Sequence, residues 1–363
     1  MSVGPASGRT YASGAGRSID LRSDTVTQPT EAMREAMRTA VVGDDGLDGD
    51  PTVRELELEG AAAMGKEDAL FVASGTMGNL VAALVNAGRG GEALVDEHAH
   101  VARSEGGGIS RLAGLMCTAV RSHGGMMDLD ALAASMRGGY SRHGPPSAMV
   151  VVETSHNHAG GRALPLPYLE AVSERAHTVG AAVHIDGARI FNAALAQGVP
   201  PATIAGFGDT VTFCLSKGLS APMGSILAGS RDFVVRARCY RRMVGGGLRQ
   251  AGCVAAAGLV ALRGMVDRLA DDHRRARALW AYLQAQMPGL GGDAPDTNIV
   301  LVDVGAWAPG GAPICAARLA SRGILVRPRD GDTLRVVLHR HIDDDAVRTA
   351  AAEIARAVEG AAA

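Results

Sequence analysis

Residues 181–190, AAVHIDGARI, decide the fold class of this chain. An apolar run of strand length ends in Asp186 and passes through Gly187 into a helical pattern, as a parallel strand does before its covering helix. The runs AMVVVE (residues 148–153) and TVTFCL (residues 210–215) have the same character, and helical patterns separate all three. The sequence therefore predicts an α/β fold whose mostly parallel sheet is covered by helices on both faces.

Similar patterns continue to both sides of this centre. We expect strands over residues 68–73, 93–96 and 115–120, and helices over 53–64, 77–87 and 167–179. The character changes near residue 260: a helix over 262–287 is followed by strands at 298–304, 324–327 and 334–339, a helix at 313–321 and a last helix from residue 343. This predicts a large domain over 19–261 and a small C-terminal α+β domain over 262–363, after a disordered tail at 1–18.

Composition excludes several classes of protein. The chain has 363 residues, of which 47% are hydrophobic and 20% charged, so it is globular. A net charge of −2 argues against a nucleic-acid partner. The longest apolar run, residues 251–262, is too short to cross a membrane, and the N-terminus does not resemble a signal peptide. Five scattered cysteines without a CxxC pair indicate reduced thiols and a cytoplasmic location.

Lysine is rare in this chain and draws attention to one position. Of 36 basic residues, only Lys66 and Lys217 are lysines. An amine can lose its proton and form a Schiff base, which a guanidinium cannot do. Lys217 follows the buried run at 210–215, whereas Lys66 lies in a polar turn and is interpreted as a surface residue. Lys217 is therefore the candidate for amine chemistry.

Two further groups precede Lys217 in the chain. Gly75 and Thr76 begin a helix directly after a strand, where free backbone amides suit a phosphate, although a simple helix cap is an equal alternative. Asp186 ends its strand, where ligands of parallel sheets bind, although an Asp before Gly is also common in turns. A phosphate, a basic ring nitrogen and an aldehyde together describe pyridoxal 5′-phosphate.

Histidines and arginines also occur in patterns that bear on function. Pairs spaced by one residue, such as His98 with His100 and His156 with His158, raise the possibility of zinc, but ligand partners at familiar spacings are missing and we expect no metal. His100 and His156 lie at the ends of predicted strands. The arginines at 238, 241 and 242 are interpreted as a solvated helix face, and Arg249 either belongs to that surface or reaches an anion.

The chain resembles the low-specificity L-threonine aldolases, which are fold-type-I pyridoxal-phosphate enzymes. The resemblance extends from Ile19 to about His341. It is carried by DLRSDTVT (20–27), GDD (43–45) with DPTV (50–53), SGTMGN (74–79), TSHN (154–157), HIDGAR (184–189), SKGL (216–219) and GLRQ (247–250). It implies a pyridoxal-phosphate-binding large domain and a smaller C-terminal domain.

The resemblance also implies what single residues do. Lys217 would hold the cofactor, Asp186 would pair with its ring nitrogen, and His100 would stack on the ring. Gly75 and Thr76 would bind the phosphate, and Arg249 would reach the cofactor of a neighbouring subunit. The substrate carboxylate would be bound by Ser23, Arg189 and Arg335. The β-hydroxyl would be contacted by His156. Lys217, His156 and His100 would be the catalytic group.

The implied activity is cleavage of L-threonine, L-allo-threonine or a related β-hydroxy-α-amino acid to glycine and an aldehyde. The implied assembly is a homodimer or a dimer of dimers with shared active sites. Leu47 stands where the family usually has a tyrosine that reaches a neighbouring site, and Leu338 replaces a usual threonine. The first change predicts a preference for phenylserine or affects subunit packing alone. The alternatives are β-elimination, racemisation or transaldol exchange on an amino acid, or a catalytically silent cofactor-binding protein.

Overall fold

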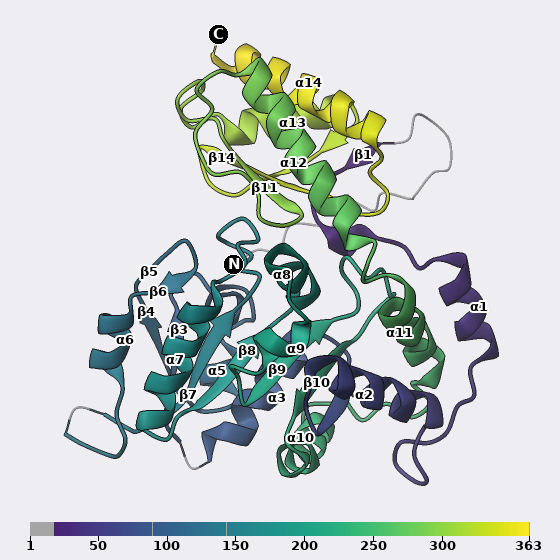
Figure 1. Ribbon diagram of the computed structural model, residues 1–363, viewed down its shortest axis with the longest axis vertical. Helices are drawn as coiled ribbons and strands as arrows, with labels where there is room; N and C mark the ends of the chain where they lie inside the picture. Colours follow the sequence, from purple (N-terminus) through teal and green to yellow (C-terminus); the bar gives the residue numbers. More distant parts are fainter. Residues whose placement is uncertain (1–17, 89, 143, 363) are drawn as a thin grey trace.

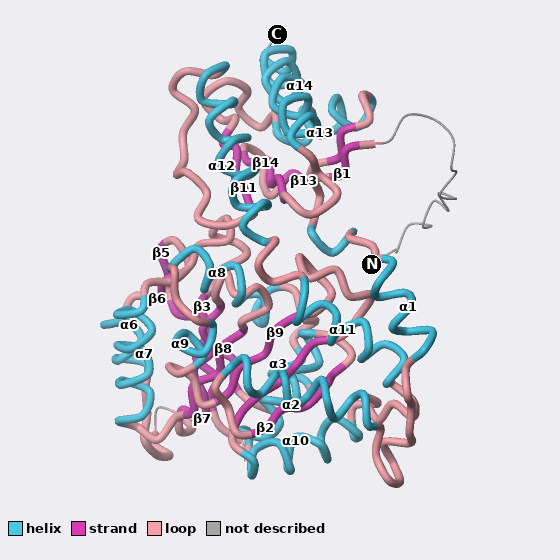
Figure 2. Tube along the Cα trace, turned by 45° about the vertical axis from the view of Figure 1, so that its right-hand side comes forward, coloured by secondary structure: helices cyan, strands magenta, loops and turns pink. Residues whose placement is uncertain are grey.

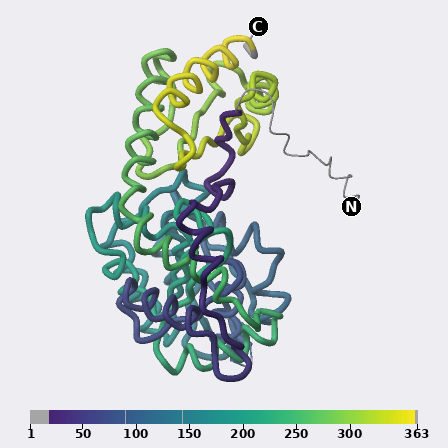
Figure 3. Tube along the Cα trace, turned by 90° about the vertical axis from the view of Figure 1, so that its right-hand side faces the viewer, coloured from purple at the N-terminus to yellow at the C-terminus, as the bar shows by residue number. Residues whose placement is uncertain are grey.

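The computed structural model describes residues 18–88, 90–142 and 144–362. The expected N-terminal tail lies, apart from Ser18, outside the described residues. Figures 1 and 2 show a larger body with a central sheet and a smaller body that holds the C-terminal helices. In Figure 3 the purple N-terminal segment leaves the smaller body and descends along the larger one.

A seven-stranded sheet forms the centre of the larger body. Its order is β2-β10-β9-β8-β7-β3-β4, and β10 alone among them runs antiparallel to its neighbours. This confirms the predicted mostly parallel α/β fold. The strands are β2 (Asp68–Val72), β3 (Glu92–Asp96), β4 (Met116–Val120), β7 (Ser147–Glu153), β8 (Ala182–Asp186), β9 (Thr210–Cys214) and β10 (Ser225–Gly229), and a small hairpin is formed by β5 (Ser122–His123) and β6 (Met126–Met127).

Helices cover this sheet, and their ends follow local sequence rules. Asp50 accepts hydrogen bonds from the amides of Thr52 and Val53, Pro51 occupies the first turn, and Gly65 closes the helix in the left-handed conformation. The elements are η1 (Asp24–Val26), α1 (Glu31–Thr39), α2 (Pro51–Met64), α3 (Gly75–Ala87), α4 (His100–Arg103), α5 (Gly108–Arg111), α6 (Leu129–Ser135), α7 (Leu166–Thr178), α8 (Ile190–Gln197), α9 (Pro201–Ala205), α10 (Arg231–Met243) and α11 (Gly252–Gly264).

The smaller body has its own sheet and its own apolar core. The sheet order is β11-β14-β13, and a second pair joins β1 to β12. Leu21, Leu279 and Val336 belong to one buried cluster here, separate from the cluster around the large sheet. The elements are β1 (Ile19–Asp20), α12 (Leu269–Gln286), β11 (Ile299–Asp303), α13 (Ala312–Ser321), β12 (Ile324–Leu325), β13 (Arg327–Pro328), β14 (Thr333–Val337) and α14 (Asp344–Ala362).

The predicted helix over residues 262–287 is wrong as a single element. α11 ends at Gly264 and α12 begins at Leu269, with a bend and a turn between them. Glycine favours such an interruption because it has the greatest backbone freedom. Leu269 still packs in the core of the larger body, whereas Ala276 packs in that of the smaller one. The break therefore lies where the chain passes between two cores.

The predicted strand over residues 324–327 is also divided. β12 pairs parallel with β1, whereas β13 pairs antiparallel with β14. Val326 separates the two because the chain changes partner there. The pairing with β1 places residues 19–20 against the smaller body. We propose that the boundary between the two domains lies near residue 262.

No helix within the described residues is both long and apolar enough to span a membrane.

The register of the central strands determines where polar side chains meet. Glu153 at the end of β7 lies opposite Asp186 at the end of β8, and Asp186 lies opposite Thr212 on β9. Because these strands are parallel, the segments that follow them leave the sheet at one edge. Lys217 follows β9 at that edge.

Candidate active site

A pocket of about 470 Å³ lies where the carboxyl edge of the large sheet meets β14 and the first described segment. It brings together six residues that the sequence singled out: Ser23, His100, Asp186, Arg189, Lys217 and Arg335. Eight further residues complete its lining: Thr25, Ser104, Glu153, Asn157, Ala188, Arg327, Pro328 and Arg329. Only Ala188 and Pro328 of these fourteen are apolar, so the pocket suits a charged ligand.

Asp186 is held by a buried network behind the pocket. The amide Nδ2 of Asn79 donates to its Oδ2 at 2.8 Å, and the Ala188 amide donates to its Oδ1 at 3.2 Å. Burial lowers the pKa of His184 to about 4, so the ring is neutral near pH 7. Its Nε2 donates to Asn79 Oδ1 at 3.0 Å, and this fixes the amide with its nitrogen toward Asp186. The carboxylate can therefore serve as a fixed anionic partner for a protonated ring nitrogen.

His100 begins α4 and reaches the same pocket. Its Nδ1 lies 2.7 Å from Oε1 of Glu105, and this hydrogen bond raises the pKa of the imidazole although burial opposes the shift. Glu153 accepts the backbone amides of His100 and Asn157 at 2.6 and 2.8 Å. Burial raises the pKa of Glu153, and the nearby Asp186 adds to this effect. Glu153 thus fixes two pocket segments through its carboxylate.

Arg189 follows β8 and is fully engaged at one edge of its guanidinium. It donates to both oxygens of Asp24, at 2.7 and 2.6 Å, in a pair whose side chains are 4% and 0% exposed. Burial opposes ionisation of Asp24, yet Arg189 holds its pKa well below the usual range. The arginine therefore has a fixed orientation beside Lys217 before any ligand binds.

Arg335 enters the pocket from the smaller body. Its Nη1 donates to the carbonyl of Arg22 at 3.0 Å and its Nη2 donates to Oδ1 of Asn157 at 2.8 Å. Burial, reinforced by the charge of Arg189, lowers the pKa of Arg335 to about 10. Both acceptors are neutral oxygens, so neither hydrogen bond neutralises the positive charge of Arg335. That charge can therefore attract an anionic ligand.

The two lysines occupy different settings. Lys217 lies in the pocket, and the Thr27 hydroxyl donates to its carbonyl at 2.9 Å. Gly218 beside it has no room for a side chain, because a Cβ would lie 2.8 Å from Leu269. Lys66 is half-buried rather than a free surface residue: its Nζ donates to the Gly208 carbonyl at 2.6 Å. Lys66 differs from the expected surface lysine because the Gly208 carbonyl, in the turn before β9, accepts its hydrogen bond.

Gly75 and Thr76 lie in the first turn of α3 and are not among the residues that line the pocket. The side chain of Ser74 caps the helix by accepting the amide of Met77. A Cβ on Gly75 would lie 2.9 Å from the sulfur of Cys214, so this helix start is packed against the end of β9. The first-turn amides of a helix of thirteen residues, next to the segment that carries Lys217, can bind a phosphate.

His156 is buried behind the pocket and does not line it. Its ring is 1% exposed, its Nδ1 accepts the Ala159 amide at 3.2 Å, and its Nε2 lies 3.5 Å from Asp96. Burial opposes protonation, but Asp96 and Glu153 raise the pKa of the imidazole. The geometry here gives His156 contacts with the protein alone, and its contact with substrate stays a prediction.

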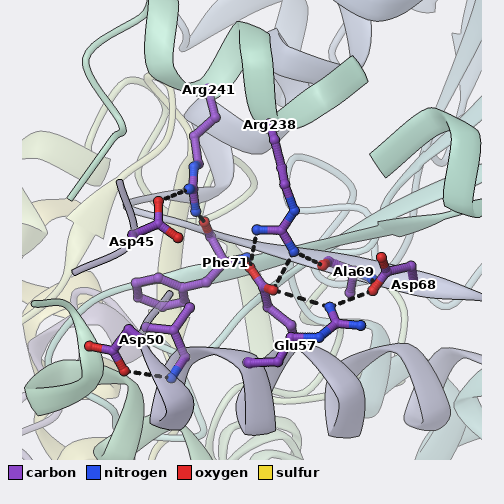
Figure 4. Close-up of polar contacts among 10 residues, drawn as sticks. Asp45, Asp50, Glu57, Asp68, Ala69, Phe71, Arg238 and Arg241 are labelled. Carbon is purple, nitrogen blue, oxygen red and sulfur yellow. Dashed lines mark hydrogen bonds and ion pairs between the residues drawn. The ribbon is translucent and has the colours of Figure 1, made fainter. Parts of the chain in front are cut away.

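Arg249 also lies outside this pocket. Its side chain is 68% exposed, and its Nη1 lies 3.2 Å from Asp44 in the acidic loop before α2. Arg241 is buried and does not belong to a solvated helix face: it donates to the Phe71 carbonyl at 3.0 Å and pairs with Asp45 (Figure 4). The interpretation of this arginine was wrong because a carbonyl of β2 and an acidic loop, both distant in sequence, cover it.

Three site residues carried weak sequence signals. Asn79 is part of SGTMGN but lies one helical turn beyond the amides that drew attention. Glu153 ends a predicted strand, as Asp186 does, and that position was its signal. Asp24 lies within the motif DLRSDTVT, and no pattern in the sequence points to its pairing with Arg189. Within the described ranges, His100, Glu105 and Asp186 also form a group that could hold a metal ion, yet Asn79 already donates to both carboxylates.

The sheet order and the pocket at its carboxyl edge define a fold-type-I α/β enzyme. The comparisons agree with this class. The model of the beta-eliminating lyase family matches residues 20–306. Low-specificity L-threonine aldolase 1 from Arabidopsis thaliana is 43% identical over 331 residues, which cover 90% of this chain and 92% of the relative.

Solved structures share the fold at lower identity. The Leishmania major threonine aldolase superposes with a TM-score of 0.77 at 16% identity and covers 94% of this chain and 99% of its own. SPT solved with PLP gives a TM-score of 0.73 at 21% identity, with 95% and 88% covered. The chain belongs to the low-specificity L-threonine aldolase family, within the beta-eliminating lyases.

Proposed function

We propose that this protein is a pyridoxal-phosphate-dependent aldolase that cleaves L-threonine, L-allo-threonine or related β-hydroxy-α-amino acids to glycine and an aldehyde. The observation that supports it most is the single pocket that holds Lys217, Asp186, His100 and Arg335 together. Family membership supports the same reaction class, that of a carbon–carbon lyase.

The residues present fit the cofactor. Lys217 would hold the aldehyde carbon through its amine, Asp186 would pair with the ring nitrogen, and His100 would lie against the ring. The backbone amides of Gly75 and Thr76, in the first turn of α3, would hold the phosphate. The close packing there leaves no space for a Cβ at Gly75. When bound, pyridoxal phosphate supplies an electron-accepting ring that stabilises negative charge at the substrate Cα.

The protein contributes orientation and proton handling. Ser23, Arg189 and Arg335 would hold the substrate carboxylate and so fix the Cα–Cβ bond relative to the ring. A base must remove the β-hydroxyl proton before that bond breaks. His100 lines the pocket and would be available for this step, whereas the predicted contact of His156 with the hydroxyl would require a rearrangement of its present hydrogen bonds.

The functional unit we propose is a homodimer or a homotetramer, with Arg249 reaching a neighbouring subunit's site. Arg249 is exposed and does not line the pocket of its own subunit. Two apolar side chains in the same region are also exposed: Leu47, close in sequence to the Asp44 that pairs with Arg249, is 80% exposed, and Met243, at the end of the helix before Arg249, is 71% exposed. Such side chains are typical of association surfaces. We further propose a cytoplasmic location, on the basis of the reduced cysteines.

The reaction is tested by incubating the holoenzyme with L-threonine, L-allo-threonine and phenylserine. Equal amounts of glycine and of the matching aldehyde support the aldolase. Release of ammonia and a 2-oxo acid would indicate β-elimination, and a change of chirality without glycine would indicate racemisation. Transaldol exchange requires a second aldehyde, and a silent binding protein would give a coloured complex without product.

A further inference from the structure

Three arginines lie together on the ribbon formed by β13 and β14. Arg327 is directly opposite Arg335 in the antiparallel register, and Arg329 continues the ribbon through a hydrogen bond from its amide to the Thr333 carbonyl at 2.8 Å. Side chains two residues apart share a face of a strand. All three arginines line the pocket that contains Lys217.

This arrangement is electrostatically unfavourable in the free protein. Like charges directly opposite each other destabilise a strand pair. The side chain of Arg327 makes no hydrogen bond or ion pair with any residue that the structure describes, and the guanidinium of Arg335 donates to neutral oxygens. Asp24 offsets only part of the repulsion at Arg335, because both of its oxygens already accept hydrogen bonds from Arg189.

Arg329 is held in place rather than free. Its Nη2 donates to Nε2 of His158 at 3.1 Å, and its Nε lies 3.6 Å from Asp330. His158 stacks on His98 with the ring centres 4.4 Å apart. Burial and the charge of Arg329 lower the pKa of His158 to about 4, so the ring acts as a neutral acceptor for the guanidinium. The two stacked rings therefore orient an arginine at the pocket wall.

In the proposed function, the α-carboxylate of the substrate is bound by Arg189 and Arg335. The positive charges of Arg327 and Arg329 are then left without a ligand. We propose that Arg327 and Arg329 bind a second anionic group, a carboxylate on the β-carbon of the substrate. The substrate class is then a β-hydroxy-α-amino dicarboxylate such as 3-hydroxyaspartate. This inference rests on the proposed function, whose pocket it uses.

The reaction on such a substrate is balanced without a further reagent. The Cα–Cβ bond of 3-hydroxyaspartate breaks, the β-hydroxyl loses its proton, and Cα gains one. The products are glycine and glyoxylate, and neither carbon needs an external oxidant or reductant. The basic wall would hold the carboxylate of the leaving aldehyde.

The first test compares kcat/KM of the holoenzyme for 3-hydroxyaspartate and 3-hydroxyasparagine, which differ by one charge at nearly equal shape. Threonine and phenylserine complete the series. We expect the acid to be favoured over the amide about tenfold or more, as for a lost charge-assisted hydrogen bond. Arg327→Gln with Arg329→Gln should bring the ratio close to one, and Arg329→Lys should keep part of it. Arg121→Gln, whose side chain is 80% exposed and lies outside the pocket, is the control.

The second test measures binding without turnover, by calorimetric titration of the holoenzyme with L-aspartate and L-asparagine. Tighter binding of aspartate, abolished by Arg327→Gln with Arg329→Gln but not by Arg121→Gln, supports the anion site. Equal affinity for the two ligands, or a preference that survives the double substitution, overturns it. Selective aspartate binding with no glycine from any of the four substrates would refute the proposed reaction while leaving the anion site in place.

Discussion

Asp24 and Arg189 lie 165 residues apart in the sequence and form a buried ion pair with two hydrogen bonds, of 2.7 and 2.6 Å. The pair ties the first described segment to the end of β8, directly beside the candidate active site. It determines which edge of the Arg189 guanidinium remains for a ligand. The stability of the fold and the geometry of the site therefore depend on the same contact.

We expect Asp24→Asn to lower the free energy of unfolding by about 3–5 kcal/mol, since it leaves a buried arginine without its counter-charge. Chemical denaturation of the holoenzyme measures this. The matched control is Asp20→Asn, which breaks an exposed pair with Arg22 and should cost less than about 1 kcal/mol. Equal losses for the two variants would contradict the structural importance of the buried pair.

His184 makes the stability of the protein depend on pH. Burial lowers its pKa in the folded state from 6.5 to about 4, so the fold favours the neutral ring. Its contribution is complete above pH 6.5 and is lost as the pH falls toward 4, by on the order of 3 kcal/mol. His184→Gln should flatten the curve of unfolding free energy in this window. An unchanged slope in His184→Gln would refute this account.

Arg335→Ala should raise the KM for the amino-acid substrate by the equivalent of about 2–3 kcal/mol, because charge-assisted hydrogen bonds to the carboxylate are lost. Steady-state kinetics with the best substrate found measure the change. Arg322→Ala removes an exposed arginine of the same body, paired with Glu353, and should leave KM unchanged. If KM and kcat of Arg335→Ala equal those of the wild type, Arg335 does not hold the carboxylate.

Shared sites predict complementation between inactive subunits. Lys217→Arg loses the amine that holds the cofactor, and Arg249→Ala loses the group that would reach the neighbouring site. A mixed dimer of the two contains one site with both residues intact, so mixing should restore part of the activity. Subunit exchange is verified with differently tagged chains. Activity that stays absent after proven exchange would indicate that Arg249 acts in its own subunit or in the fold alone.

The sequence was sufficient for six of the seven strands of the large sheet and for the residues at its edge, whereas the antiparallel strand β10 was not predicted. Asp186 and Lys217 each follow an apolar run, and the carboxyl ends of adjacent parallel strands must meet. Their convergence in one pocket therefore follows from topology. The break between α11 and α12 was not predicted, because it depends on tertiary packing. The first part of the helical pattern packs in the core of the larger body and the second part packs in the core of the smaller one.

Contacts between distant segments could not be predicted. Asn79 reaches Asp186 across 107 residues, and its orientation depends on His184 in another element. Arg241 carries the same sequence signal as a solvated helix residue, but Asp45 and the Phe71 carbonyl cover it. A charge pattern along one helix contains no information about what lies across from it.

The central claim is that Lys217 carries the cofactor, and borohydride reduction of the holoenzyme followed by peptide mapping tests it most directly. The chain offers a built-in comparison, because Lys66 is its only other lysine. Lys66 lies in the turn that precedes β2, whereas Lys217 follows the carboxyl end of β9. The account predicts that reduction fixes pyridoxal phosphate covalently on Lys217 and that Lys217→Arg folds without retaining the label. A label on Lys66, or a reduced protein with no label on either lysine, would contradict it.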